Sequence, residues 1–118
     1  MEHPVEETAR ELMRLGDLDG AEKIAEAEIE RIGERTDTVE IWRLRLIRAQ
    51  VLGARGRVEG ALKYLDSLTP PATDDVESIA TLKFCRGSFS GYLGRDEISH
   101  RLLGEAEIMA RDAGLLRL

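Results

Sequence analysis

A short pattern that occurs three times along the chain limits its fold more than any other feature. Each copy has a glycine, at position 16, 56 or 94, and five residues later a small residue, which is Ala21, Ala61 or Ser99. The glycines lie 40 and 38 residues apart. Self-similarity with a period of about 20 to 50 residues is typical of stacked structural units. The pattern therefore predicts three copies of one helical hairpin, of which the stretch 42–68 is the clearest.

Hydrophobic periodicity predicts two helices in each copy. Apolar residues recur at steps of three and four, the period of an amphipathic helix, whereas no clean period-two alternation indicates a strand. The predicted helices cover about 4–15, 18–32, 38 to between 53 and 56, 58–68, 75–93 and 98–113. The predicted fold class is therefore all-α, with six helices in three stacked antiparallel hairpins. These form a single domain, 1–118, whose units span about 3–35, 37–69 and 74–114.

Two capping boxes predict where the third and fifth helices begin. Asp37 with Glu40, and Asp74 with Glu77, have the three-residue spacing of this motif. The fifth helix is weakened by the glycines between 87 and 94, since each costs up to about 1 kcal/mol of helix propensity relative to alanine. We therefore expect packing against a neighbouring helix to stabilise the fifth helix.

Composition and charge disfavour several classes of function. The 118 residues suffice for one domain, and 17 basic against 23 acidic residues give a net charge of −6, which repels nucleic acid and anionic lipid. The acidic N-terminus does not resemble a signal peptide, and no apolar run approaches the roughly 18 residues of a membrane span. The single cysteine, Cys85, excludes an internal disulfide. A cytoplasmic location is expected.

The sequence shows no set of residues arranged for catalysis or for binding a cofactor or metal. His3 and His100 are far apart, and neither has a metal ligand at helical spacing. The stretch 87–91 resembles a nucleophile elbow only superficially, because phenylalanine occupies the place of the serine. The stretch 53–56 lacks the lysine of a phosphate-binding loop, and Cys85 is interpreted as a packed core residue. We therefore expect no enzymatic activity, no cofactor and no metal.

The three copies resemble the tetratricopeptide repeat in several phased positions. Seven residues before each glycine stands a small residue (Ala9, Ala49, Gly87). Four residues before the glycine, the first two copies have a leucine (Leu12, Leu52). The spacing exceeds the usual period of about 34 residues. It is similar to that of arrays in bacterial regulators and in large proteins with a caspase-like peptidase domain. The resemblance implies a right-handed superhelix and a chain that forms one segment of a longer protein.

The resemblance also implies that the first helix of each hairpin lines a concave groove. When the groove positions of the family are carried over to these repeats, the candidate partner-binding residues are Arg10, Met13, Arg14, Arg43, Leu46, Gln50, Phe84, Ser88 and Tyr92, with His3, Glu6 and Thr81 beside them. Arginines next to apolar and aromatic residues suit a peptide with a carboxylate and apolar anchors. Alternatively, Phe84 and Tyr92 belong to the core and the arginines pair with glutamates of the helix surface. The chain has no asparagine, so it does not inherit the asparagine-based carboxylate clamp of the family.

Two functions follow from these patterns. The first is a noncatalytic scaffold that binds a protein or peptide partner in the groove. The second is a structural spacer or self-association module of a larger signalling or regulatory protein, which acts through the apolar stretch 109–118 as a homo-oligomer.

Overall fold

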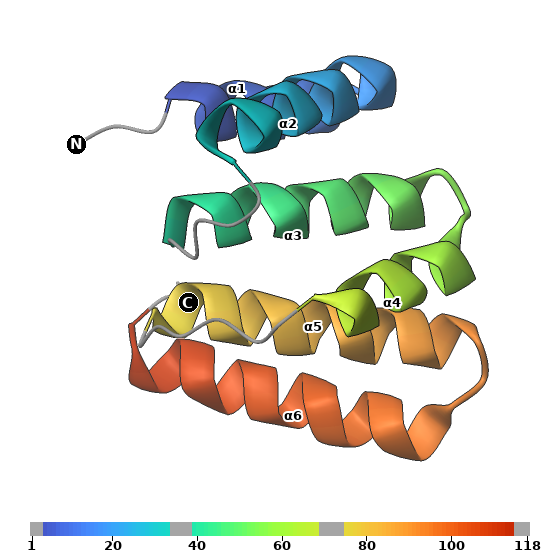
Figure 1. The fold of residues 1–118 in the computed structure, drawn as a ribbon. Helices are drawn as coiled ribbons and strands as arrows, with labels where there is room; N and C mark the ends of the chain where they lie inside the picture. The colour runs from blue at the N-terminus through green and yellow to red at the C-terminus, as the bar shows by residue number, and fades with distance from the viewer. Residues whose placement is uncertain (1–3, 34–38, 69–74, 115–118) are drawn as a thin grey trace.

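The computed structural model describes residues 4–33, 39–68 and 75–114, and within these ranges the chain forms six α-helices (Figure 1). They are α1 (Pro4–Arg14), α2 (Leu18–Ile32), α3 (Val39–Ala54), α4 (Val58–Ser67), α5 (Val76–Tyr92) and α6 (Asp96–Asp112). The helices pack pairwise as α1 with α2, α3 with α4 and α5 with α6. The prediction of an all-α fold with three stacked antiparallel hairpins is confirmed, and no helix end differs from its predicted position by more than two residues.

The turns inside the three hairpins have the same structure. Gly16, Gly56 and Gly94 adopt φ values of +86°, +81° and +82°, a left-handed conformation that glycine tolerates without steric cost. The residue after each glycine donates its backbone N–H to the carbonyl oxygen five residues earlier. These bonds join Asp17 to Leu12 (2.8 Å), Arg57 to Leu52 (3.0 Å) and Arg95 to Ser90 (2.8 Å). The repeat in the sequence is therefore a structural repeat, with equivalent positions 40 and then 38 residues apart.

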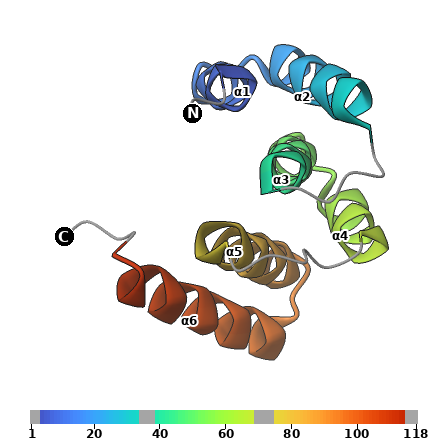
Figure 2. The ribbon, with the colours of Figure 1, turned by 60° about the vertical axis from the view of Figure 1, so that its left-hand side comes forward.

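Consecutive hairpins are joined through their first helices. α3 packs on both α1 and α2, and α5 packs on both α3 and α4. The larger core cluster joins the first hairpin to α3, and a second cluster joins α3 and α4 to α5. Figure 2 shows that each hairpin is rotated relative to the preceding one, so that α1 and α6 lie on either side of α3 and α5. The stack is therefore curved.

The N-cap of α5 is Asp75, whose carboxylate accepts the backbone N–H of Ser78. The predicted capping box began one residue earlier, at Asp74, and Asp74 lies outside the described residues, as does Asp37. α5 thus begins with the capping chemistry expected from the sequence, but at the second of the two adjacent aspartates.

Glycines inside α5 allow α6 to approach closely. A Cβ atom added at Gly87 would lie 2.9 Å from Cγ of Leu103, and one added at Gly91 would lie 2.7 Å from Oγ of Ser99. Real Cβ atoms do not come this close to other atoms, so a side chain at either position would require α6 or its side chains to move away. Packing against α6 thus stabilises the glycine-rich part of α5, as expected from its weak helix propensity.

Two glycine-to-alanine substitutions test this packing. We expect Gly87→Ala to lower the free energy of unfolding by about 1–3 kcal/mol, because the new methyl group overpacks the contact with α6. Gly60→Ala is the matched control in α4, where the nearest atom to the new Cβ is 4.0 Å away. It should raise stability by up to about 1 kcal/mol through helix propensity. Urea unfolding followed by circular dichroism measures both, and a stabilised Gly87→Ala protein would contradict the packing explanation.

Candidate functional site

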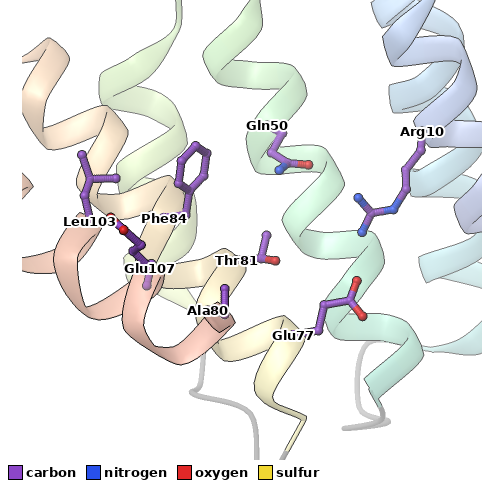
Figure 3. Close-up of a pocket in the computed structure, with 10 residues that line it drawn as sticks. Arg10, Gln50, Glu77, Ala80, Thr81, Phe84, Leu103 and Glu107 are labelled. Atoms are coloured by element: carbon purple, nitrogen blue, oxygen red, sulfur yellow. The ribbon is translucent and has the colours of Figure 1, made fainter. Parts of the chain in front are cut away.

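A cleft of about 620 Å³ opens on the side of the stack where α1, α3 and α5 lie, between α1 and α6 (Figure 3). All three hairpins contribute to its lining. α1 contributes Arg10 and α3 contributes Gln50; α5 contributes Glu77, Ala80, Thr81 and Phe84; α6 contributes Leu103, Ala106, Glu107 and Ala110. Its volume is in the range of known ligand-binding clefts, which is about 300–1,000 Å³.

The cleft has an apolar wall on α5 and α6 and a polar rim. Phe84 leaves 54% of its surface exposed, and Leu103 lies next to it in Figure 3. Arg10 comes from the opposite side, with Gln50 between them, and Glu77 and Glu107 lie at the edges. A large exposed aromatic side chain in a concave, mostly apolar site is typical of a surface that binds a partner.

Five of the nine residues predicted to line a groove are brought together. Arg10, Gln50 and Phe84 line the main cleft, and Met13 and Arg14 line a second hollow of about 410 Å³ that shares Arg10 and Gln50 with it. Thr81, which was placed beside the predicted groove, also lines the main cleft.

The other four predicted residues have different surroundings. Leu46 is only 1% exposed and belongs to the core between the second and third hairpins. Ser88 and Tyr92 do not line the cleft, although Tyr92 is 74% exposed. Arg43 is partly buried in ion pairs. The alternative that placed Phe84 and Tyr92 in the core is therefore wrong, since both lie on the surface.

The arginines do pair with acidic residues, as that alternative proposed. Nε of Arg10 donates to Oε2 of Glu6 at 3.2 Å, and the guanidinium group of Arg14 pairs with Glu11. These pairs neutralise part of the positive charge next to the cleft. The site is consequently less basic than a count of its arginines indicates.

Arg43 connects the first helices of all three hairpins. Its Nη2 lies 3.2 Å from Oδ1 of Asp75 and 3.3 Å from Oε2 of Glu77 on the α5 side, and its Nη1 lies 3.9 Å from Oε1 of Glu6 on α1. Burial alone would raise the pKa of Asp75, but hydrogen bonds from Ser78 and Arg43 outweigh it and hold that pKa below its usual value. Arg43 is thus a structural link between helices.

Cys85 lies in the core behind the cleft and is 2% exposed. Burial raises the pKa of its thiol to about 11, although a hydrogen bond with Gln50 and the charge of Arg10 act in the opposite direction. The thiol is therefore protonated at neutral pH. Its environment agrees with the interpretation of Cys85 as a packed core residue.

The contribution of α6 to the cleft was not predicted. Leu103, Ala106, Glu107 and Ala110 were missed because the resemblance assigned only the first helix of each hairpin to the groove. One signal was present in the sequence, since the apolar stripe of α6 is broader than packing on a single helix requires. The additional apolar positions face the cleft.

Comparison of the sequence with protein-family models found no match, and comparisons with curated proteins and with solved structures also found none. Among the described residues, no helix has the length and apolar composition needed to cross a membrane. Within the same ranges, no group of three or more histidine, cysteine, aspartate or glutamate side chains is arranged to hold a metal ion. The resemblance to the tetratricopeptide repeat therefore rests on the phased residues of this chain alone.

The pair between Arg43 and Asp75 should make stability depend on pH. Asp75→Asn keeps a capping side chain but removes the charge, so we expect a loss on the order of 1–2 kcal/mol at neutral pH. Because the pKa of Asp75 is lower in the folded protein, its stabilising effect is present above the unfolded pKa of about 3.9 and is lost as the pH falls through the folded pKa. The difference between wild type and Asp75→Asn should thus shrink below about pH 4.

Urea unfolding at a series of pH values measures this difference. Asp66→Asn is a suitable control, because the side chain of Asp66 is 69% exposed and its ion pair should contribute less than about 1 kcal/mol. A stability difference for Asp75→Asn that persists unchanged to strongly acidic pH would contradict the assigned role of its charge.

Burial should also protect Cys85 from thiol reagents. At about pH 8 we expect a disulfide reagent such as DTNB to react with the folded protein at least about a hundredfold more slowly than with the denatured chain. The rate can be followed by absorbance with and without denaturant. Equal rates would show that the thiol is accessible in the folded protein.

Proposed function

We propose that this protein is a noncatalytic helical-repeat module of the tetratricopeptide type that binds a partner protein in the cleft between α1 and α6. The observation that carries the proposal is the exposure of Phe84 in a concave site whose wall is otherwise formed by small and apolar side chains. Exposed aromatic residues in such sites are typical hot spots of protein interfaces.

The repeated turn supports the assignment to a helical-repeat class. Each hairpin has the same left-handed glycine and the same backbone hydrogen bond, and small residues at equivalent positions are buried between its helices. Repeat proteins of this kind use the curvature of the stack to present a continuous binding surface.

The free thiol of Cys85 suits a reducing compartment, so a cytoplasmic location is part of this proposal.

The charges at the rim indicate which partners suit the cleft. Arg10 is paired with Glu6, and Glu77, which is paired with Arg43, lies on the same side of the cleft (Figure 3). Glu107 lies across the cleft beside Leu103 and is paired with Arg111. Because Arg10 and both carboxylates are already ion-paired, a strongly charged peptide of either sign would gain little from them. The partner therefore binds mainly through apolar side chains.

Self-association is the second candidate. The observation that favours it is that α6 exposes two large aliphatic side chains, Ile98 at 44% and Ile108 at 57%. Exposed apolar side chains on one helix can form an interface between two copies of a chain.

A site-specific cross-link distinguishes these functions. With p-benzoylphenylalanine in place of Phe84, we expect irradiation in the native host to give adducts with a partner protein, because this side chain lies in the proposed interface. The same group in place of Lys63, whose side chain is 79% exposed on α4, is the matched control and should give far fewer adducts. Mass spectrometry identifies the products.

Equal yields from positions 84 and 63 would contradict binding in the cleft. An adduct with twice the mass of the chain would favour self-association instead.

A further inference from the structure

At both junctions between hairpins, the first helix of the following hairpin presents an equivalent apolar stripe to the preceding hairpin. α3 packs on the first hairpin through Leu44, Ile47 and Val51, and α5 packs on the second through Leu82, Cys85 and Phe89. The two sets are 38 residues apart, which is the offset of the repeat. In both, apolar residues at positions i, i+3 and i+7 form one stripe of the incoming helix.

An ion pair at each junction repeats in the same way. At position i+4 of the stripe, Arg48 pairs with Glu26 at 3.1 Å, and Arg86 pairs with Asp66 at 3.4 Å. Both acids lie on the second helix of the preceding hairpin and occupy equivalent positions. The incoming helix is therefore held in the same orientation each time.

The surface on which a hairpin packs the first helix of the next hairpin is called its receiving surface. The third hairpin has an equivalent receiving surface, but none of the described helices covers it. In the second hairpin the incoming helix packs on Leu46, Leu65 and Leu68, and the equivalent residues of the third hairpin are Phe84, Leu103 and Ala106. All three line the cleft. Leu46 is 1% exposed because α5 covers it, whereas its equivalent Phe84 is 54% exposed because no described helix covers it.

We propose that the cleft receives an amphipathic α-helix of a partner protein, with apolar residues at i, i+3 and i+7, in the manner in which the second hairpin receives α5. This inference rests on the proposed function and specifies the chemistry of the partner. The helix lies across Phe84, Leu103 and Ala106. Its backbone hydrogen bonds are satisfied internally, so only its side chains need to match the apolar wall.

A second copy of this chain does not suit the cleft. If two copies stacked end to end, α1 would take the place of the incoming helix. Two of its stripe positions are Glu7 and Glu11, both of which are exposed to solvent. Stacking would remove the Glu7 carboxylate and the ion pair of Glu11 with Arg14 from water and place them against Phe84 and Leu103, which costs their hydration. The incoming helix is therefore not α1 of a second copy.

The third hairpin lacks the acid that forms an ion pair at the first two junctions. The acid that pairs with arginine at the earlier junctions, Glu26 or Asp66, is replaced by Gly104. A Cβ atom added at Gly104 would have no atom within 4 Å. An arginine at i+4 of the partner helix would therefore find no acid at the position equivalent to Glu26 and Asp66.

A synthetic peptide tests the inference directly. The probe is a fluorescein-labelled peptide of residues 39–56 of this chain, which contains the stripe Leu44, Ile47 and Val51. Fluorescence anisotropy with the full-length protein should show binding that is weakened about tenfold or more by Phe84→Glu, because a charge then replaces the central apolar contact. Tyr92→Glu is the matched control, because Tyr92 is an exposed aromatic residue of the same helix that lies outside the cleft. This substitution should change the affinity by less than about twofold.

Two further peptides separate recognition of a helix from recognition of an extended chain. A peptide with serine at positions 44, 47 and 51 should lose binding, since it lacks the stripe. A peptide with Arg48→Pro keeps the stripe but cannot form the helix, and it should also lose binding. Ala110→Glu, on the α6 side of the cleft, should weaken binding of the original peptide independently of Phe84.

Equal binding of the Arg48→Pro peptide, equal binding by Phe84→Glu, or no binding of the original peptide would each overturn the helix proposal. The cross-link at position 84 is a separate readout. Adducts formed there despite such a result would leave the cleft as a protein-binding site for a partner that is not helical.

Discussion

Close approach of the two helices in each hairpin is the packing constraint on which the rest of the structure depends. In the first hairpin, Ala9 and Ala21 are completely buried, as are Ala49 and Ala61 in the second. Larger side chains at these positions would separate the helices and remove the van der Waals contacts of the core. Because the left-handed glycine fixes the turn in the same way each time, equivalent positions meet in all three hairpins. Every hairpin consequently offers a similar surface to the next.

Local signals were sufficient to predict the helices, whereas the cleft was predicted only in part. The phase of the repeat determines which face of α1, α3 and α5 is turned outward, and this explains why Arg10, Gln50 and Phe84, three of the predicted groove residues, lie together in the cleft lining. The wall on α6 depends on the rotation of the third hairpin against the other two, for which no short sequence pattern is diagnostic. The same holds for ion pairs such as that of Arg43 with Asp75, which joins residues 32 positions apart.

The two ends of the stack are chemically different. α1 presents exposed carboxylates at the positions where α3 and α5 carry apolar stripes, so the first hairpin needs no cover. The third hairpin presents Phe84 and apolar side chains of α6 instead. Carboxylates on α1 are well hydrated when this end is exposed to water, whereas the apolar side chains of the third hairpin are more stable when another helix covers them. Specificity is correspondingly expected in the third hairpin, whose apolar surface is the one that the described helices leave uncovered.

Arg43 has a consequence for how the protein unfolds. Linear repeat arrays can lose their units one at a time, because each unit contacts only its neighbours. Here a single guanidinium group contacts carboxylates on both α1 and α5 and is itself anchored on α3. Detaching either terminal hairpin would leave part of this partly buried charge cluster unpaired, which is unfavourable in a low-dielectric environment. We therefore expect this link to couple the three hairpins, so that the chain unfolds more cooperatively than an array whose units contact only their neighbours.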